Sequence, residues 1–185
     1  MIKELLKKIE IGIAIRQDIL ENQAKIVFLG IGSNLGYRKT NIEKAKFFLS
    51  QYKLQFISVS SYYETPSWPD PINPKFLNII LKIKCKFKPH ELLKICKDIE
   101  VKLGRKKTTR NAPRICDLDV IDFNGEVSKK NEKFYLPHKM MHKRNFVLFP
   151  LFEIQKKWIH PSKQKDVKTL ISLLPDRDIR SIKKI

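Results

Sequence analysis

The sequence predicts an α+β fold of the ferredoxin-like type, a βαββαβ sandwich in which an antiparallel sheet has its helices on one face. The first observation is the order of patterns along the chain, in which four strand-like stretches are interspersed with two amphipathic helical stretches. The second observation is the position of the turn signals, since turns that contain Gly or Pro separate these stretches. Such a sheet leaves its other face free for a ligand, although the fold alone does not define a function.

The first strand and the first helix are predicted at the start of this order. Residues 26–31 form a continuous apolar run that is typical of a central strand buried on both faces. After a turn at residues 32–36, Thr40 and Glu43 fit a capping box at the start of a helix. The inner stripe of that helix is predicted to contain Ile42, Ala45, Leu49 and Tyr52.

The second and third strands are predicted on either side of a Pro-rich loop at residues 65–71. The second strand spans about residues 55–63, and the third spans about residues 76–84. Alternation in the third strand places one set of side chains on the core face: Leu77, Ile79, Leu81 and Ile83. Phe76 and Asn78 then stand on the opposite face, which the fold leaves open.

A second helix and a fourth strand complete the pattern. Pro89 lies in the first turn of the helix and Gly104 ends it. The inner stripe of this helix is predicted to contain Leu92, Ile95, Cys96, Ile99 and Leu103. A basic loop at residues 105–114 then leads into the fourth strand at about residues 115–123.

The length of 185 residues fits one domain with appendages. Residues 1–24 are predicted to be an N-terminal helical extension, residues 25–160 the domain, and residues 161–185 a C-terminal tail that packs on it or trails from it. No stretch approaches the ~20 uninterrupted apolar residues of a membrane helix, so no membrane partner is expected. Three cysteines without a CxxC pair favour a reducing compartment, the cytoplasm.

The formal net charge is +19, with 38 Lys and Arg against 19 Asp and Glu. One interpretation is a partner that carries phosphate, either nucleic acid or a nucleotide. The other is a lysine-rich bias that shows on every exposed surface. The lysines are spread along the whole chain, which favours the second interpretation for most of them.

Asp117 and Asp119 are the sharpest chemical signal. Residues two apart on a strand point the same way, so both carboxylates are predicted to meet on one face. Two neighbouring anions repel unless a cation sits between them, and hard oxygen ligands with few protein contacts suit Mg²⁺. The alternative is a surface strand with two solvated acids.

The basic loop upstream of these aspartates favours the metal interpretation. Residues 104–114 place five cationic side chains directly before the two acids. Arginine binds phosphate oxygens in a fork and keeps its charge, so it can neutralise charge on a transferred phosphoryl group. Mg²⁺ and an arginine-rich loop together provide the positioning and the charge stabilisation that phosphoryl transfer requires. Taken alone, the loop favours the interpretation as a solvated basic segment.

A third cluster lies at residues 137–146. His138 and Arg144 are six residues apart and could both reach a phosphate, while Phe146 could offer a flat apolar face. A lone histidine is more often structural. The sequence has no GxxxxGK[ST] motif, which excludes a P-loop.

Together these segments resemble the 6-hydroxymethyl-7,8-dihydropterin pyrophosphokinase family over about residues 26–160. The matching stretches, in the family's order, are residues 30–36 (GIGSNLG), 60–66 (SSYYETP), 76–78 (FLN), Glu100 with Gly104-Arg105, 112–119 (APRICDLD), 136–138 (LPH) and 144–151 (RNFVLFPL). Each stretch is weak alone, but the ordered set is specific.

The resemblance implies transfer of the β,γ-pyrophosphate of ATP to the hydroxymethyl oxygen of the pterin, with release of AMP, in folate synthesis. It implies that Asp117 and Asp119 hold two Mg²⁺ ions, and that Arg105 and Arg114 join them in catalysis. The positions that match ATP-binding residues are Glu100, Arg105, Arg110, Arg114, His138 and Arg144, with the main chain near Val120.

For the pterin, the resemblance implies a ring stacked between Phe76 and Phe146. Asn78 and the backbone around three loop residues would bind its edge: Thr65, Pro66 and Trp68. The implied partners are ATP and a reduced hydroxymethylpterin, with no nucleic acid, a monomeric chain, and possible contact with the next enzyme of the folate pathway. Asn111 stands where the family often has a tryptophan.

Two other functions remain open at the level of the sequence. Ferredoxin-like sheets with exposed aromatic residues bind single-stranded RNA, but the closely spaced aromatics of that signature are absent from this sequence. A metal-dependent nucleotidyl transferase or nuclease could use the same two aspartates. The product would separate it from the pyrophosphokinase, since AMP rather than pyrophosphate is expected from the latter.

Overall fold

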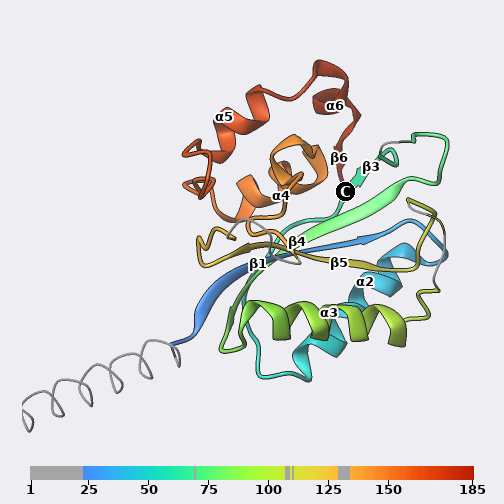
Figure 1. The fold of residues 1–185 in the computed structure, drawn as a ribbon. Coiled ribbons are helices and arrows are strands. Elements are labelled where there is room, and N and C mark those ends of the chain that lie inside the picture. The colour runs from blue at the N-terminus through green and yellow to red at the C-terminus, as the bar shows by residue number, and fades with distance from the viewer. Residues whose placement is uncertain (1–22, 69, 107–108, 110, 129–133) are drawn as a thin grey trace, which may run out of the picture.

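The computed structural model describes residues 23–68, 70–106, 109, 111–128 and 134–185. Most of the predicted N-terminal extension, residues 1–22, lies outside the described residues. The described chain is an antiparallel sheet between two helical layers, with α2 and α3 below it and α4, α5 and α6 above it in the view of Figure 1. The predicted ferredoxin-like α+β fold is confirmed, with an added layer on the second face.

The strands are β1 (Lys25–Ser33), β2 (Gln55–Val59), β3 (Tyr63–Thr65), β4 (Phe76–Cys85), β5 (Asp117–Phe123) and β6 (Lys183–Lys184). Their order across the sheet is β5-β1-β4-β3-β6, and β2 pairs with β4 beside β3. The single second strand predicted over residues 55–63 is therefore wrong. Its residues form two strands with a break at residues 60–62, where the Ser60 N–H donates to the Ile80 carbonyl and the Ser60 Oγ accepts from the Ile80 N–H.

The lower layer is the one that the sequence predicts. Helices α2 (Arg38–Ser50) and α3 (Pro89–Lys102) pack against one face of β1, β4 and β5. The buried residues at this interface include the predicted core face of β4 and most of both predicted helical stripes: Leu77, Ile79, Leu81, Ile83, Ile42, Ala45, Leu49, Leu92, Ile95, Cys96 and Ile99. Tyr52 and Leu103, also predicted in these stripes, lie just past the ends of α2 and α3 and are only partly buried against this core.

The predicted capping box is wrong, because α2 begins two residues before Thr40. Its N-cap is Tyr37, which makes no side-chain cap, and Thr40 lies within the first turn. Glu43 instead accepts hydrogen bonds from Lys46 and from the Tyr62 hydroxyl. The glutamate thus connects α2 to the segment between β2 and β3.

The upper layer corrects the prediction that helices cover only one face. It consists of the 3-10 turn η1 (Met141–Lys143) and the helices α4 (Asn145–Ile154), α5 (Val167–Ser172) and α6 (Asp176–Ser181). A second apolar cluster joins it to the sheet: Phe28, Ile80, Ile121, Met141, Val147, Leu148, Leu151, Trp158, Val167, Leu170 and Leu174. Because β1, β4 and β5 each present an apolar residue on this side, the second face can be buried over part of its length.

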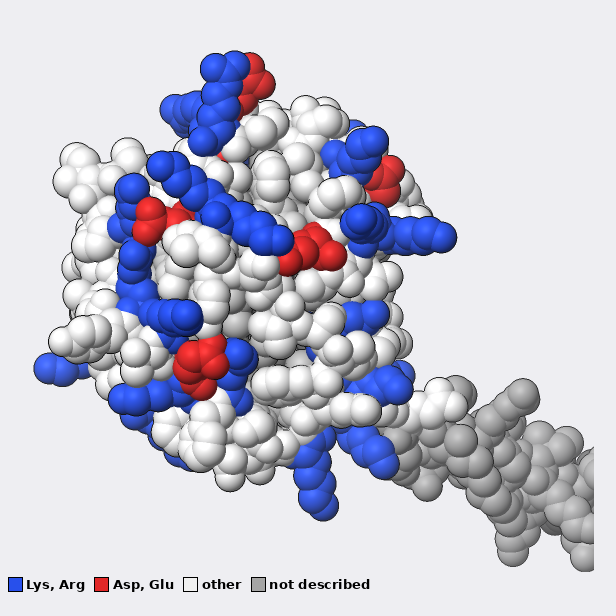
Figure 2. All heavy atoms as spheres, turned by 180° about the vertical axis from the view of Figure 1, so that it is seen from behind, with Lys and Arg blue, Asp and Glu red and all other residues white. Residues whose placement is uncertain are grey.

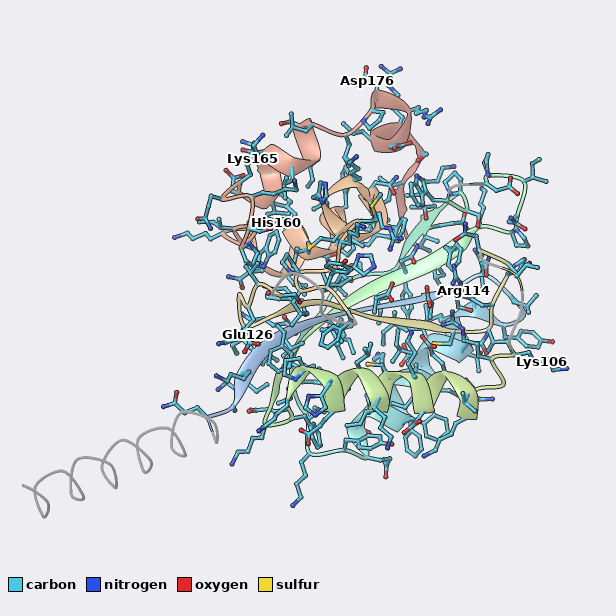
Figure 3. The ribbon with its side chains drawn as sticks, in the orientation of Figure 1. Lys106, Arg114, Glu126, His160, Lys165 and Asp176 are labelled. Carbon is cyan, nitrogen blue, oxygen red and sulfur yellow. The ribbon has the colours of Figure 1, made fainter. Side chains whose placement is uncertain are left out.

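On the face of the molecule seen from behind, basic side chains are scattered rather than gathered. Figure 2, which views the molecule from behind, shows Lys and Arg side chains spread among uncharged residues, with few acids between them. Figure 3 shows Arg114 and Lys106 at one end of the sheet and His160 in the upper layer. Among the described residues, no helix is long and apolar enough to span a bilayer.

Candidate active site

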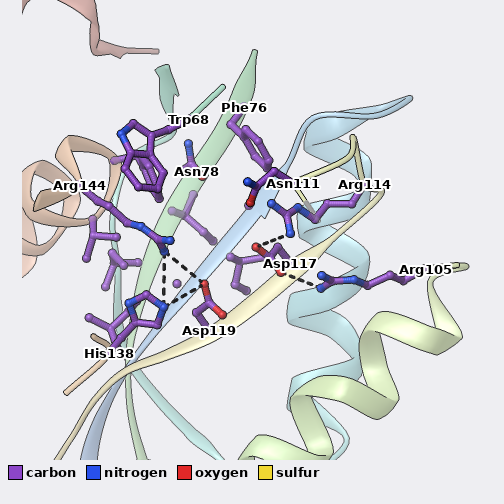
Figure 4. Close-up of a pocket in the computed structure, with 18 of the residues that line it drawn as sticks. Trp68, Phe76, Asn78, Arg105, Asn111, Arg114, Asp117, Asp119, His138 and Arg144 are labelled. Atoms are coloured by element: carbon purple, nitrogen blue, oxygen red, sulfur yellow. Dashed lines mark hydrogen bonds and ion pairs between the residues drawn. The ribbon is translucent and has the colours of Figure 1, made fainter. Parts of the chain in front are cut away.

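A cavity of about 280 Å³ lies on the upper face of the sheet, beside the helices of the upper layer. Strands β1, β4 and β5 form its floor, and the loops around Trp68, Arg114 and His138 supply its sides (Figure 4). Ten predicted site residues line it: Trp68, Phe76, Asn78, Arg105, Arg114, Asp117, Asp119, His138, Arg144 and Phe146. Residues distant in sequence therefore meet in one place.

Strand β5 presents Asp117 and Asp119 on the cavity face, as their spacing predicts. The intervening Leu118 is buried in the opposite core. On the neighbouring strand β1, Asp117 pairs with Gly32 and Asp119 pairs with Gly30. The absence of side chains on these glycines leaves the floor open beside both carboxylates.

Asp117 is an ion-paired carboxylate. The Asp117 Oδ1 lies 2.7 Å from Arg105 Nη1, and its Oδ2 lies 3.5 Å from Arg114 Nη1. Burial opposes ionisation of Asp117, but the charges of Arg114 and Arg105 outweigh it and hold the pKa of Asp117 below its usual range. The carboxylate is therefore charged at neutral pH.

Asp119 has the opposite shift. Burial, together with the charge of Asp117, raises the pKa of Asp119 above its usual value. His138 Nε2 and Arg144 Nη1 lie 4.0 and 3.9 Å from Asp119 Oδ2, too far for strong pairing. The structure thus contains two carboxylates, two residues apart on one face of β5, of which Asp117 is ion-paired and Asp119 has no close cationic partner among the described residues, and a bound cation would relieve their repulsion.

Glu100 stands behind this site rather than in it. Its side chain is 3% exposed, and Oε2 lies 2.6 Å from Arg105 Nη1. Oε1 accepts from Lys97 Nζ at 2.9 Å and from the Leu118 N–H at 2.7 Å. Glu100 therefore fixes the position of Arg105 and the start of β5 together, and Lys97 lines the cavity beside them.

The aromatic end of the cavity is covered by guanidinium groups. The Arg114 Cζ lies 5.6 Å from the centroid of the Phe76 ring. The Arg144 Cζ lies 5.5 Å from the ring centroids of both Trp68 and Phe146. Among the described residues, Nε of Arg114 and Nε of Arg144 are buried without a hydrogen-bond partner. These donors are available for an anionic ligand.

Asn78 lies close to the glycine of β1 that pairs with it. A Cβ atom at Gly32 would stand 2.8 Å from Asn78 Oδ1 and 3.4 Å from Phe76 Cδ1. The Asn78 Nδ2 donates to Thr65 Oγ1 at 3.3 Å, which leaves Oδ1 beside the cavity. Only glycine at position 32 allows both side chains to lie over the sheet in this way.

The remaining predicted residues fall around the cavity. Thr65 is buried behind Asn78, Pro66 lines a neighbouring cavity of about 250 Å³, and Val120 points into the lower core. Arg110 lies outside the described residues. Lys97 was not predicted as a site residue from the sequence. Its position one helical turn before Glu100 could have indicated it, because residues three apart on a helix are neighbours. Asn111, with a φ of 65°, also lines the cavity.

The chemistry of the two aspartates fits Mg²⁺. This ion binds proteins through one or two carboxylates and completes its shell with water and phosphate oxygens. A closed site of three or more His, Cys, Asp or Glu is not found in the part of the chain that the structure describes. Two carboxylates that share an open cavity with arginines are typical of enzymes that transfer phosphoryl groups.

Comparison with known families defines this class further. The chain belongs to the 7,8-dihydro-6-hydroxymethylpterin-pyrophosphokinase family, whose model matches residues 28–156. It is 37% identical over 142 residues to the 2-amino-4-hydroxy-6-hydroxymethyldihydropteridine pyrophosphokinase of Aquifex aeolicus, covering 77% of this chain and 88% of that protein. The Bacillus subtilis protein of the same name is 40% identical over 134 residues, which is 70% of this chain and 77% of the relative. The family and the enzyme class predicted from the motifs are confirmed.

Other relatives are longer proteins. The chain is 40% identical over 138 residues to the folic acid synthesis protein FOL1 of Dictyostelium discoideum, which is 74% of this chain but 20% of that protein. Among solved structures, wild-type HPPK-DHPS of Plasmodium falciparum superposes with a TM-score of 0.61 at 16% identity, covering 80% of this chain and 44% of that one. An HPPK-DHPS in complex with substrates gives a TM-score of 0.67 at 13% identity over 88% of this chain and 46% of that one. These two structures support the fold.

Proposed function

We propose that this chain transfers the β,γ-pyrophosphate of ATP to 6-hydroxymethyl-7,8-dihydropterin, releasing AMP, as a step of folate synthesis. The observation that supports it best is that one cavity contains both side chains suited to a metal-bound polyphosphate and side chains suited to a flat polar ring. The pair of aspartates faces Arg105 and Arg114 at one end, and aromatic rings with Asn78 lie at the other. A polyphosphate and a flat polar ring can therefore bind side by side.

Asp117 and Asp119 would hold Mg²⁺, with two ions expected. Bound there, the metal would neutralise the triphosphate and orient it for in-line transfer. Asp117 is held ionised by its arginines, so it offers a charged ligand from the start. Burial and the charge of Asp117 raise the pKa of Asp119, and a bound cation would favour its ionised form.

The cationic side chains would bind the transferred group. Arg105 is fixed from behind by Glu100, so its charge is oriented before the nucleotide arrives. Arg114 and Arg144 each have a buried Nε with no hydrogen-bond partner among the described residues, and a phosphate oxygen can satisfy it. His138 lies beside Asp119. Its Nε2 could donate a hydrogen bond to a phosphate if the contact between Nε2 and Arg144 Nη1 breaks. Arg110 would join this set, and the main chain near Val120 would contact adenine or ribose.

The pterin would stack between Phe76 and Phe146, each stacking contact contributing ~1 kcal/mol beyond burial. Asn78 would bind its polar edge through Oδ1, with the backbone around Thr65, Pro66 and Trp68 completing the contact. In this structure one guanidinium group lies over each of these rings, Arg114 over Phe76 and Arg144 over Phe146. Arginines that move from the rings to the phosphates would expose the faces that the pterin needs.

A cytoplasmic location is part of the proposal. The three cysteines, Cys85, Cys96 and Cys116, are free and buried, and burial raises the pKa of the Cys96 thiol to about 12. A thiol with such a pKa is protonated at neutral pH, and free thiols are typical of a reducing compartment. A monomeric chain, with possible docking on the next folate enzyme, completes the proposal.

The test is a turnover assay with purified chain, Mg·ATP and reduced hydroxymethylpterin, in which AMP and pterin pyrophosphate are separated by chromatography. Pterin-dependent AMP formation that stops with EDTA is the expected result. Asp119→Ala should lower the rate by about 10²–10³ or more, since it removes a charge from the reacting centre. Asp98→Asn, on the exposed side of α3, is the control.

Near-normal turnover in Asp119→Ala would refute the metal assignment. Release of pyrophosphate instead of AMP would replace the proposal with a nucleotidyl transferase. A chain that binds ATP but forms no AMP would refute the activity while leaving the nucleotide site intact.

A further inference from the structure

The C-terminal segment (residues 176–185) contacts both sides of the aromatic end of the cavity. It contains α6 and β6 and lies beyond residue 156, where the match to the family model ends. Figure 1 shows α6 beside α4 and β6 beside β3. Helix α4 and strand β3 also contact each other directly, so this segment is an additional connection between them.

The first side is β3 and the loop that follows it. Strand β6 pairs antiparallel with β3, with Tyr63 opposite Lys184 and Glu64 opposite Lys183. The Ile185 N–H donates to the Tyr62 carbonyl at 2.9 Å. Because β3 runs directly into the loop that contains Trp68, β6 fixes the outer edge of the strand that carries this ring to the cavity.

The second side is the start of α4. Asn145 lies between the cavity residues Arg144 and Phe146 and is 8% exposed. Its Nδ2 donates to the Asp178 carbonyl at 2.6 Å and to Ser181 Oγ at 3.2 Å. Its Oδ1 accepts from the Phe146 N–H at 2.7 Å. One side chain therefore joins α6 to the backbone that holds Phe146.

A third contact connects the two sides to each other. Glu153, on α4, accepts hydrogen bonds from the Tyr63 hydroxyl at 2.9 Å and from the Ser61 hydroxyl at 2.8 Å. Its Oε1 also lies 3.0 Å from Lys184 Nζ on β6. Helix α4, strand β3 and strand β6 thus form one polar network at this end of the molecule.

We propose that the C-terminal segment is a positioning element for the pterin. It would act through Asn145 on Phe146 and through the β6–β3 pairing on Trp68, and it would keep the two sides of the site at a fixed spacing. The spacing is narrow, since one guanidinium lies 5.5 Å from both ring centroids. A shift of the Phe146 ring by ~0.5–1 Å would weaken its stacking on the pterin, and a shift of the loop around Trp68 would weaken the backbone contact with the pterin edge, so both would lower affinity.

This proposal rests on the proposed function, and it makes a selective claim. Apart from Arg144, the nucleotide end of the cavity is positioned by contacts outside this segment, as Arg105 is by Glu100 on α3 and by Asp117 on β5. Loosening the C-terminal segment should therefore weaken pterin binding and leave nucleotide binding unchanged. A general loss of stability would affect both ligands, so the ratio of the two affinities separates positioning from folding.

The experiment uses the full chain with Mg²⁺ and a non-hydrolysable ATP analogue. Pterin affinity is measured in the presence of the analogue, and analogue affinity is measured alone. Ile185→Pro removes the N–H that bonds to Tyr62, whereas the matched control Ile185→Ala keeps it. Asn145→Ala removes the contact with α6, and Ser181→Ala is a milder version that removes one acceptor.

Ile185→Pro and Asn145→Ala are each expected to weaken pterin binding about fivefold to tenfold, the loss of a hydrogen bond that positions the site. Ile185→Ala should bind like the parent, and analogue affinity should stay within about twofold in every variant. Pterin affinity within twofold of the parent in Ile185→Pro, Asn145→Ala and Ser181→Ala would overturn the proposal.

Equal loss of both ligands in a folded variant would also overturn it, because the segment would then act on stability alone. Failure of the proposed function would give a different result, because it would already appear in the parent chain. A parent chain that binds the analogue but no pterin would refute the pterin assignment itself, before any variant is compared.

Discussion

The guanidinium of Arg114 lies over the ring of Phe76, with Cζ 5.6 Å from the ring centroid, while its Nη1 points to Asp117 at 3.5 Å. One side chain therefore covers the stacking face predicted for the pterin and also pairs with a carboxylate predicted to bind metal. Both contacts compete with ligands. The arginine can leave the ring when a phosphate offers it a stronger partner.

Arg114→Ala is expected to separate these two functions. Without nucleotide, pterin should bind as tightly as in the parent or about twofold to fivefold more tightly, because a cation–π contact of ~0.5–1 kcal/mol no longer covers the ring. The rate of transfer should fall about 10²–10³, since the charge that faces the phosphates is lost. Fluorescence titration and single-turnover assays measure the two effects.

Arg114→Lys is the control, since it keeps the charge and loses the fork. It should recover part of the transfer rate. A loss of pterin affinity in Arg114→Ala as large as that in Phe76→Ala would show that the arginine supports the ring rather than covers it.

Gly32→Ala tests the close approach between β1 and β4. The new Cβ would meet Asn78 Oδ1 at 2.8 Å, which is shorter than a tolerated contact, so Asn78 must move. Pterin affinity is expected to fall about tenfold and the free energy of unfolding to drop by about 1–3 kcal/mol, the usual cost of overpacking. Equilibrium binding and urea denaturation measure the two quantities.

The same substitution in an Asn78→Ala background provides the control. If the clash with Asn78 is the cause, Gly32→Ala should cost less there, and the difference is the coupling energy between the two positions. Equal costs in both backgrounds would mean that Phe76 or the backbone, rather than Asn78, limits the space.

Short-range patterns predicted the lower half of this fold and the floor of the site. The period of two in β4 places Phe76 and Asn78 opposite Leu77 and Ile79, and the same rule brings Asp117 and Asp119 together. These features depend only on strand geometry. The pattern of β5 is therefore enough to predict the carboxylate pair, although not the arginines that surround it.

The upper layer could not be predicted in the same way. Helix α4 (NFVLFPLFEI) is apolar on nearly all sides and contains Pro150, so it shows no helical stripe and contains a helix breaker. Strand β6 is two lysines long, and its existence depends on pairing with β3 more than a hundred residues earlier in the chain. Contacts of this kind depend on the assembled fold rather than on local sequence.

Glu100→Gln is expected to destabilise the protein and to slow transfer together. The glutamine can still accept from the Leu118 N–H, but the charge opposite Arg105 and Lys97 is lost. Because Glu100 is buried and both cations are partly exposed, the expected loss in unfolding free energy is about 1–3 kcal/mol. Urea denaturation and kcat measure the outcome.

Asp98→Asn on the same helix is the matched control, since it removes one negative charge from an exposed position. It should change the free energy of unfolding by no more than about 0.5 kcal/mol. If both variants cost the same, net charge on α3 rather than the buried contact of Glu100 would be responsible.

His160 makes the stability of the upper layer depend on pH. It is 2% exposed, its Nδ1 accepts from the Lys163 N–H at 3.3 Å, and its ring lies 5.8 Å from that of His142 and 5.6 Å from that of Trp158. Burial, with the nearby charges of His142 and Lys163, lowers its pKa from 6.5 to about 4. The folded protein therefore resists protonation that the unfolded chain accepts.

The sign of the effect follows from this difference. Above pH 6.5 His160 is neutral in both states and makes no contribution to the pH dependence; between pH 6.5 and 4 the unfolded chain binds the extra proton. Unfolding free energy should therefore fall as the pH drops through this window, by at most about 3 kcal/mol for this residue. Urea denaturation at several pH values measures the slope.

His160→Gln should flatten the slope between pH 6.5 and 4, whatever it does to absolute stability. His90→Gln is the matched control, since His90 is exposed on α3, and it should leave the slope as in the parent. The change must appear as a difference in slope, because carboxylates that protonate in the same range affect the parent and both variants equally. An unchanged slope in His160→Gln would mean that the buried ring takes up its proton without loss of packing against Trp158.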